Sequence, residues 1–338
     1  MKYFDVSNKN IKIHGLNVAD QERGQFWRLP QEIVDKMPEG YIHAGKRCTG
    51  GRLRFKTNST KISVKYILAR VTVDICMPLP GSAGIDVYSR YGTDAKFLGY
   101  AAPVAHSNDQ TAIEKVFSKS SEMENITVNF PRNEHVLAME IGVEDNAKLL
   151  PPDDYHITRP IVFYGSSITE GGCAPRPGNQ YTSILCRWLD ADYYCYGFSG
   201  AAKGEIAFAE FIAAHKDMSL FVYDYDHNAP DPEHLLKTHE PFFHIVRRAH
   251  PKLPVILMTR PDFKAGNSDN QKRRDAVYRT FINAKNSGDE NIYFIDGEQF
   301  FGFIGREECT IDGCHPNALG FMRMAETIYP LAKSLLGK

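Results

Sequence analysis

The sequence has 338 residues, of which 43% are hydrophobic and 24% are charged, and its formal net charge is −1. This composition is typical of a globular protein rather than a disordered or fibrous one, the near-neutral charge disfavours a strongly basic nucleic-acid binder, and the length predicts about two domains. The chain has no run of about 18 apolar residues, and its N-terminal stretch MKYFDVSNKNIKIHGLN lacks the apolar segment of a secretory signal. We therefore expect a cytoplasmic protein that does not bind membranes, unless a secretion signal has been removed.

The N-terminal part, residues 1–150, is rich in short segments in which apolar and polar residues alternate. These segments lie at 51–68, 86–92, 96–102 and 124–143, and turns rich in Gly, Asn, Ser and Pro separate them. Alternation with a period of two is typical of half-buried antiparallel strands. The pattern predicts an all-β domain, a β-sandwich or jelly roll, without long amphipathic helices.

After a proline-rich linker, KLLPPDDYHITRP, the pattern changes to short apolar strands that alternate with helices. The strands are expected at 160–164, 191–196, 219–225, 254–259 and 291–295, and the helices at about 180–190, 204–215, 231–250, 271–286 and 315–336. Such alternation predicts βαβ units, and therefore a parallel sheet with helices on both faces, in a second domain over residues 158–338. The seven cysteines include no CxxC pair, which favours reduced thiols over a disulfide framework or a zinc ribbon.

Ligands of such sheets bind beyond the carboxyl ends of the strands, so the chemistry is expected in three loops. The loops are GSSITEGG (165–172), GFSGAAKGE (197–205) and DHNAPDPE (226–233). The first resembles a phosphate-binding loop in its glycines. However, Cys173 follows the glycine pair where a Walker loop needs lysine and then Ser or Thr, and no GxGxxG fingerprint is present. Nucleotide binding is therefore disfavoured.

Ser167 is a candidate nucleophile, because Gly165 and the small Ser166 permit a sharp turn that would project Ser167 above the sheet edge. The segment is not a GxSxG elbow, since Thr169 stands where the second glycine would be. A plain turn or a helix cap remains the alternative for this segment.

A serine nucleophile needs a general base that a third group orients. In TIDGCHPNALGF, Asp312 lies three residues before His315, so its carboxylate could accept the Nδ1 proton and leave Nε2 free. Pro316 suits the first turn of the following helix. The alternative is that Asp312 caps this helix and His315 is a surface residue.

Two further residues could donate hydrogen bonds to an oxyanion: Gly200 through its backbone N–H and Asn228 through its side-chain amide. The alternatives are an ordinary strand-to-helix turn for Gly200 and an Asx-turn for Asn228. A catalytic metal is disfavoured, because the histidines of HEPFFH are five residues apart, with Pro241 between them, and do not share one helical face.

Taken in order, GSSIT, GFSG, DHN and DGCHP resemble the four blocks of the SGNH or GDSL hydrolase superfamily. The resemblance implies a flavodoxin-like three-layer α/β/α domain that needs no cofactor and no metal. It also implies the site residues, which are Ser167 as nucleophile, His315 as base, Asp312 as its orienting group, and Ser167 (backbone N–H), Gly200 and Asn228 as the oxyanion hole. Two departures are Ser166, where the Asp of GDS stands, and Ala229, where an Asp often follows the Asn.

The segment Gly84-Ile85-Asp86-Val87-Tyr88, together with FWRLP near residue 28, is similar to the GxDLY branch of these enzymes, which carries an N-terminal β-sandwich. The branch implies an esterase that removes short acyl groups, acetyl in particular, from a carbohydrate, so that the substrate is a small-molecule or oligosaccharide ester and the sandwich is a lid or a substrate-binding wall. Trp27, Arg28, Asp86 and Tyr88 could reach the pocket, but sandwich core and rim positions are favoured.

Two alternative functions stay open: an acyltransferase that uses the same acyl-enzyme, and a non-catalytic binding protein. The sequence also leaves the oligomeric state open, although an exposed sandwich edge could pair two copies as a homo-oligomer.

Overall fold

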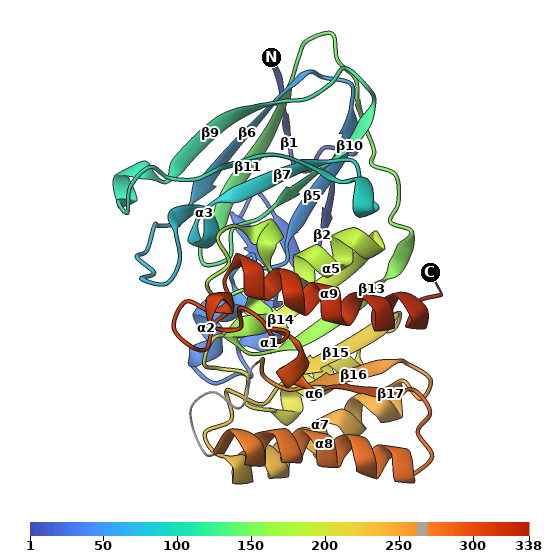
Figure 1. Ribbon diagram of the computed structural model, residues 1–338. Helices are drawn as coiled ribbons and strands as arrows, with labels where there is room; N and C mark the ends of the chain where they lie inside the picture. The colour runs from blue at the N-terminus through green and yellow to red at the C-terminus, as the bar shows by residue number, and fades with distance from the viewer. Residues whose placement is uncertain (262–268, 338) are drawn as a thin grey trace.

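The computed structural model describes residues 1–261 and 269–337, and it combines antiparallel sheets in the N-terminal part with a parallel sheet in the C-terminal part (Figure 1). Both predicted fold classes are thereby confirmed. None of the helices in these residues is both long enough and apolar enough to cross a membrane. The cysteines form no disulfide with one another in the part of the chain that the structure describes.

The N-terminal domain is a sandwich of two antiparallel sheets. The four-stranded sheet has the order β1 (Lys2–Asp5), β11 (Val136–Val143), β6 (Lys61–Leu68), β9 (Ala112–Ser118). The six-stranded sheet has the order β12 (Leu149–Leu150), β5 (Arg52–Thr57), β10 (Glu124–Asn129), β7 (Ile85–Ser89), β8 (Lys96–Ala101), with β2 (Lys12–His14) also paired to β5. Ile62, Val64 and Tyr66 alternate along β6 and are buried in one core with Leu53 and Phe55 of β5, as expected for strands with one face inward.

Short elements between the sandwich strands extend toward the other domain. They are β3 (Val18–Asp20), β4 (Gln25–Trp27), α1 (Gln31–Val34), α2 (Gly40–Gly45) and α3 (Leu79–Ser82). Val34 and Tyr41, of α1 and α2, are buried in the core of the parallel-sheet domain, where the Tyr41 ring lies 4.8 Å from that of Phe198. The first 150 residues therefore contribute to both cores, and Figure 1 shows α1 and α2 beside the parallel sheet.

The parallel sheet has the strand order β14, β13, β15, β16, β17. The bounds are β13 (Ile157–Gly165), β14 (Ala191–Gly197), β15 (Leu220–Asp224), β16 (Val255–Met258) and β17 (Ile292–Ile295). Counted along the chain this is the order 2-1-3-4-5 of flavodoxin-like folds. The carboxyl ends of β13, β14 and β15 consequently lie side by side.

Helices cover both faces of this sheet. The bounds are α4 (Ser167–Glu170), α5 (Tyr181–Leu189), α6 (Ile206–Ala213), α7 (Pro232–Ala249), α8 (Asp269–Asn286) and α9 (Ala318–Leu335). Val162 and Tyr164 of β13 pack in a core with α6, α7 and α8, whereas Ile161 and Phe163 pack in a second core with α5 and α9. Helices α5 and α9 lie on the side of the sheet that faces the sandwich (Figure 1).

Two local predictions need correction. The side chain of Asn317 caps α9 by accepting hydrogen bonds from the backbone N–H groups of Leu319 and Gly320, so Pro316 lies before the helix and not in its first turn. Within the predicted linker, β12 pairs with β5 and β13 starts at Ile157, so only Lys148 and residues 151–156 are irregular.

Candidate active site

Ser167 lies at the start of α4, directly beyond the end of β13. The Ser166 hydroxyl accepts a hydrogen bond from the Ile168 N–H at 3.1 Å and so caps this short helix. Asp and Ser are both favoured N-caps, which gives a physical reason why Ser166 can stand where related enzymes have Asp. The cap holds the first residue of α4, Ser167, at the edge of the sheet.

Two glycines allow α4 to pass this close to the strand ends. Gly165 and Gly197 are paired in register at the ends of β13 and β14. A Cβ on Gly165 would lie 2.3 Å from Thr169 Oγ1, and a Cβ on Gly197 would lie 2.1 Å from the Glu170 nitrogen. These glycines are therefore required by the close approach of backbone segments.

Ser167, His315 and Asp312 form a continuous hydrogen-bonded chain. Ser167 Oγ lies 2.8 Å from His315 Nε2, and His315 Nδ1 lies 2.7 Å from Asp312 Oδ2. The other carboxylate oxygen of Asp312 accepts from the backbone N–H of His315 at 2.7 Å and of Cys314 at 3.0 Å. With Nδ1–H donated to Asp312, Nε2 is left as an acceptor for the serine proton.

The electrostatic surroundings keep Asp312 ionised. Partial burial alone would raise the pKa of its carboxyl group. The hydrogen bonds from the backbone and ring of His315 and from the backbone of Cys314 outweigh burial and hold the pKa below its usual value.

Gly200 and Asn228 line the same pocket as Ser167 and His315, and its volume is about 450 Å³. Gly200 has φ +68 and open space around its Cβ position. The side-chain amide of Asn228 donates one hydrogen bond, 2.7 Å long, to the carbonyl of Phe198. This bond orients the side chain of Asn228, although Ala229 stands where related enzymes often have an Asp. It leaves the second amide hydrogen of Asn228 for another acceptor.

A buried carboxylate beside this site, Glu170, was not singled out from the sequence. Its side chain has no exposed surface, and it accepts from Arg28 at 2.6 Å, Arg47 at 3.1 Å and Arg132 at 2.9 Å. Burial alone would raise the pKa of Glu170, but Arg132, Arg47 and Arg28 hold it well below its usual range. Glu170 also accepts from the backbone N–H of Ser199 at 3.0 Å and from its hydroxyl.

Glu170 therefore connects three arginines of the N-terminal part to the two loops that carry Ser167 and Gly200. The only signal in the sequence was a carboxylate three residues after Ser167 in GSSITE, and such a residue is ordinarily solvated. Its three arginine partners lie at least 38 positions away along the chain and could not be identified locally.

The sandwich also supplies part of the pocket wall, through Asp74, Cys76, Arg132 and Asn133.

The four residues that the sequence offered as possible pocket residues, Trp27, Arg28, Asp86 and Tyr88, make other contacts. Arg28 is buried against Glu170, whereas Asp86 accepts from Arg176 at 2.6 Å and from the Gly178 N–H at 2.9 Å. Tyr88 contacts Arg176 as well, and Trp27 lies under Lys46. None of Trp27, Arg28, Asp86 and Tyr88 lines the pocket of Ser167.

Comparison with protein families gives two matches that together span most of the chain. A model described as the GDSL-like Lipase/Acylhydrolase family matches residues 158–333. A second model, GxDLY, described as the N-terminus of Esterase_SGNH_hydro-type, matches residues 1–149. A comparison with curated proteins found no match.

Solved structures share the whole two-part architecture. A protein from Bacteroides ovatus ATCC 8483, described as a GDSL-like lipase, is 25% identical with a TM-score of 0.86, and the match covers 99% of this chain and 98% of that one. A salicylyl-acyltransferase from a tetracycline biosynthetic pathway is 19% identical with a TM-score of 0.80, covering 99% and 97%. An acetyl xylan esterase from Butyrivibrio proteoclasticus is 11% identical with a TM-score of 0.64, covering 100% of both chains.

Proposed function

Because this chain belongs to the GDSL-like lipase/acylhydrolase family, we propose that it is a serine esterase that removes short acyl groups, acetyl in particular, from a carbohydrate. The two family matches confirm the resemblance seen in the sequence, and they support hydrolysis or transfer of an acyl group. One observation carries the proposal: Ser167 Oγ lies 2.8 Å from His315 Nε2, in the same pocket as Gly200 and Asn228.

In the proposed reaction, His315 Nε2 takes the proton of Ser167 while Oγ attacks the ester carbonyl. The backbone N–H groups of Ser167 and Gly200 and the free amide hydrogen of Asn228 stabilise the oxyanion. Protonated His315, stabilised by Asp312, then gives its proton to the leaving alcohol, which yields an acyl-serine. A water molecule, deprotonated by His315, hydrolyses this ester and releases the acid.

The preference for a carbohydrate rests on the pocket and on the structural comparison. Its wall carries the polar side chains of Arg47, Asp74, Arg132 and Asn133 beside the reacting serine, and sugar hydroxyls need such partners. One of the similar structures is an acetyl xylan esterase.

Transfer of the acyl group to a second alcohol is the other candidate, and it is favoured by the similarity over the whole chain to a salicylyl-acyltransferase. The two functions share the acyl-enzyme and differ in what attacks it. Analysis of the products formed with competing alcohols distinguishes them, because an acyltransferase gives a new ester and a hydrolase gives the free acid.

The test of the proposed nucleophile compares two adjacent serines. We expect Ser167→Ala to abolish hydrolysis of p-nitrophenyl acetate and labelling by a fluorophosphonate probe. Ser166→Ala removes a helix cap, which costs about 1 kcal/mol of stability, but it should retain turnover within about tenfold. Loss of labelling in Ser166→Ala with normal labelling of Ser167→Ala would overturn the assignment.

A further inference from the structure

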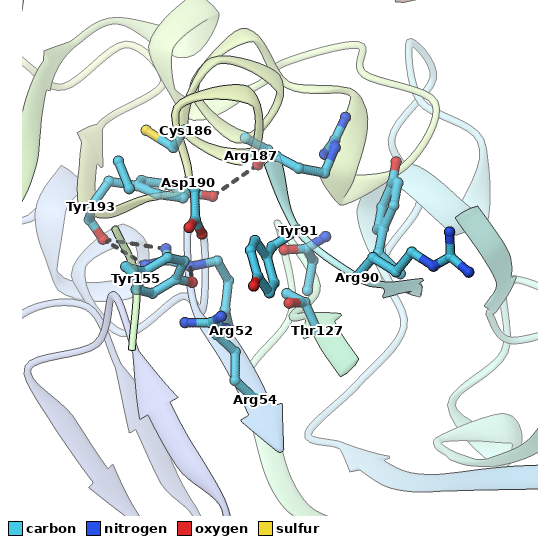
Figure 2. Close-up of a pocket in the computed structure, with 14 residues that line it drawn as sticks. Arg52, Arg54, Arg90, Tyr91, Thr127, Tyr155, Cys186, Arg187, Asp190 and Tyr193 are labelled. Carbon is cyan, nitrogen blue, oxygen red and sulfur yellow. Dashed lines mark hydrogen bonds between the residues drawn. The ribbon is translucent and has the colours of Figure 1, made fainter. Parts of the chain in front are cut away.

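A second, smaller cavity lies between the two domains and shares no lining residue with the pocket of Ser167. Figure 2 shows Arg52 and Arg54 reaching it from the sandwich, and Arg187, Asp190 and Tyr193 from the catalytic domain. Its volume is about 30 Å³, whereas a cavity needs roughly 10–15 Å³ to hold one water molecule. The cavity therefore has room for a few waters or one small ion, and not for a sugar.

Arg54 is a buried cation in this cavity that forms no ion pair with a carboxylate among the described residues, although Asp153 and Asp154 lie near enough to interact with its charge. It is 1% exposed, and its Nε and Nη1 atoms have no hydrogen-bond acceptor in the described part of the chain. Its guanidinium stacks over the Tyr155 ring at 3.8 Å. Since an arginine stays charged in proteins, and an unpaired buried charge is costly, a missing acceptor is expected here.

The neighbouring arginines differ in how fully they are paired. Arg52 is bound to Asp192 at 2.5 Å and Arg90 to Glu124 at 2.7 Å. Arg187 donates to the carbonyl of Gly178 at 3.1 Å and lies 4.3 Å from the Tyr88 ring, with no carboxylate partner in the described residues. Arg54 and Arg187 therefore give the cavity an excess of positive charge and of unused donors.

Among the described residues that line the cavity, Asp190 is the one carboxylate, and it presents an unused acceptor. It ends α5 in a left-handed conformation with φ 48. Its Oδ2 accepts from the backbone N–H of His156 at 3.1 Å, whereas its Oδ1 is buried and has no donor among the described residues. A ligand that satisfies the whole cavity must accept hydrogen bonds from Arg54 and also donate one to Asp190.

We propose that this cavity is a binding site for hydrogen phosphate. The ionised oxygens of phosphate accept from the guanidinium of Arg54 and from Arg187, a geometry for which the arginine fork is well suited. The remaining P–OH group donates to Asp190 Oδ1.

The same carboxylate discriminates between phosphate and sulfate. At about pH 7 phosphate keeps at least one proton and sulfate keeps none. Sulfate would therefore leave Asp190 Oδ1 unpaired beside a second anion. A bound phosphate joins β5 of the sandwich to α5 of the catalytic domain, so its binding must also stabilise the contact between the two domains.

The proposal is tested by isothermal titration calorimetry of the full chain with inorganic phosphate and with sulfate, at constant ionic strength and neutral pH. We expect phosphate to bind at least tenfold more tightly than sulfate, and to raise Tm by about 2–4 °C at roughly ten times its Kd. Glucose 6-phosphate, which is too large for the cavity, should give no heat of binding. A heat of binding equal to that of phosphate would mean that the phosphate group binds at an open surface, and it would overturn the proposal.

Two variants and one control locate the site. Arg54→Gln should weaken phosphate binding at least tenfold, and Asp190→Asn, which the left-handed position tolerates, should bring phosphate and sulfate to equal affinity. Arg279→Gln, an exposed arginine on α8, should bind as the wild type does. Wild-type protein without a phosphate response, or with equal affinity for sulfate, would contradict the proposal. If Arg54→Gln does not fold, phosphate binding is measured by the broadening of the ³¹P NMR line of inorganic phosphate in the presence of wild type and of Asp190→Asn.

Discussion

Asp312 uses one carboxylate oxygen on the ring of His315 and the other on the backbone of the same residue. The tight loop between them is closed by a bridge of Thr310 to Pro316. The carboxylate therefore sets the position of the residue as well as the tautomer of its ring. The spacing of three residues predicted the ring contact, but not the bonds to the backbone.

We predict that Asp312→Asn lowers kcat by about 10²–10⁴-fold with a much smaller effect on KM. The amide cannot accept the Nδ1 proton in the same way and favours the tautomer whose Nε2 is protonated. Steady-state kinetics with p-nitrophenyl acetate measure this effect. Asp109→Asn, on the exposed surface of the sandwich, is the control and should leave kcat unchanged; an equal loss in both variants would contradict the prediction.

At the scale of elements, the site depends on the crossing of α4 over the ends of two parallel strands. Gly165 and Gly197 are register partners there, and Gly171, with φ 87, ends α4 after one turn. The turn is so short that any shift of the strand ends moves Ser167 as well.

Gly197→Ala is predicted to displace α4, because the added Cβ would lie 2.1 Å from the Glu170 nitrogen and 2.5 Å from the Thr169 carbonyl carbon. We expect a loss of about 1–3 kcal/mol of stability by urea denaturation, and at least a tenfold loss of kcat because Ser167 moves away from His315. Gly288→Ala is the control: its Cβ position is open and its φ is +86, so it should lose stability through backbone strain and retain kcat. Full activity in Gly197→Ala would contradict the prediction, because it would show that catalysis does not depend on the close approach of α4 to the strand ends.

The elements that the sequence predicted are those with a strong periodic signal. The five parallel strands are apolar runs between helices, and each lies where it was predicted. The signal is strongest for β15 and β16, in which every residue is buried. The strands β1, β2, β3, β4 and β12 were not predicted, since they are two to four residues long and carry too few residues to show an alternation. Strand β9 was also missed, although it has seven residues. The path of residues 29–45 into the second core was also missed, because a local apolar pattern does not say which core it joins.

At the scale of the whole molecule, the sandwich is bound to the catalytic domain through buried ionic contacts. Asp86 of β7 holds the turn at Pro177–Asn179 by way of Arg176 and the Gly178 N–H. Arg52 of β5 binds Asp192 of β14. The ion pairs of Glu170 with Arg28, Arg47 and Arg132, which we call the Glu170 cluster, reach α4, the helix that begins at Ser167. We therefore infer that the sandwich positions the catalytic loops in addition to forming part of the pocket wall.

The Glu170 cluster gives the last prediction, which concerns both stability and catalysis. In Glu170→Gln the arginines Arg28, Arg47 and Arg132 lose their shared anion, and breaking a buried charge set in this way costs about 3–5 kcal/mol. Because Glu170 also holds the Ser199 N–H, next to Gly200, we expect kcat to fall while KM changes little, as for a positioning residue whose loss misaligns the oxyanion donors. Glu122 is an exposed carboxylate paired with Arg90, so the control variant Glu122→Gln should change neither the stability nor kcat.

The dependence of stability on pH separates this charge effect from a simple packing defect. The pKa of Glu170 in the folded protein lies below its value of about 4.3 in an unfolded chain. Its contribution to stability is therefore fully present above about pH 5, and it is lost as the pH falls through the folded pKa. The difference in the free energy of unfolding between wild type and Glu170→Gln should accordingly narrow when urea denaturation is repeated below about pH 4. A difference that stays constant from pH 7 to pH 3 would mean that the variant acts through packing, and that the arginines of the sandwich do not hold the site by charge.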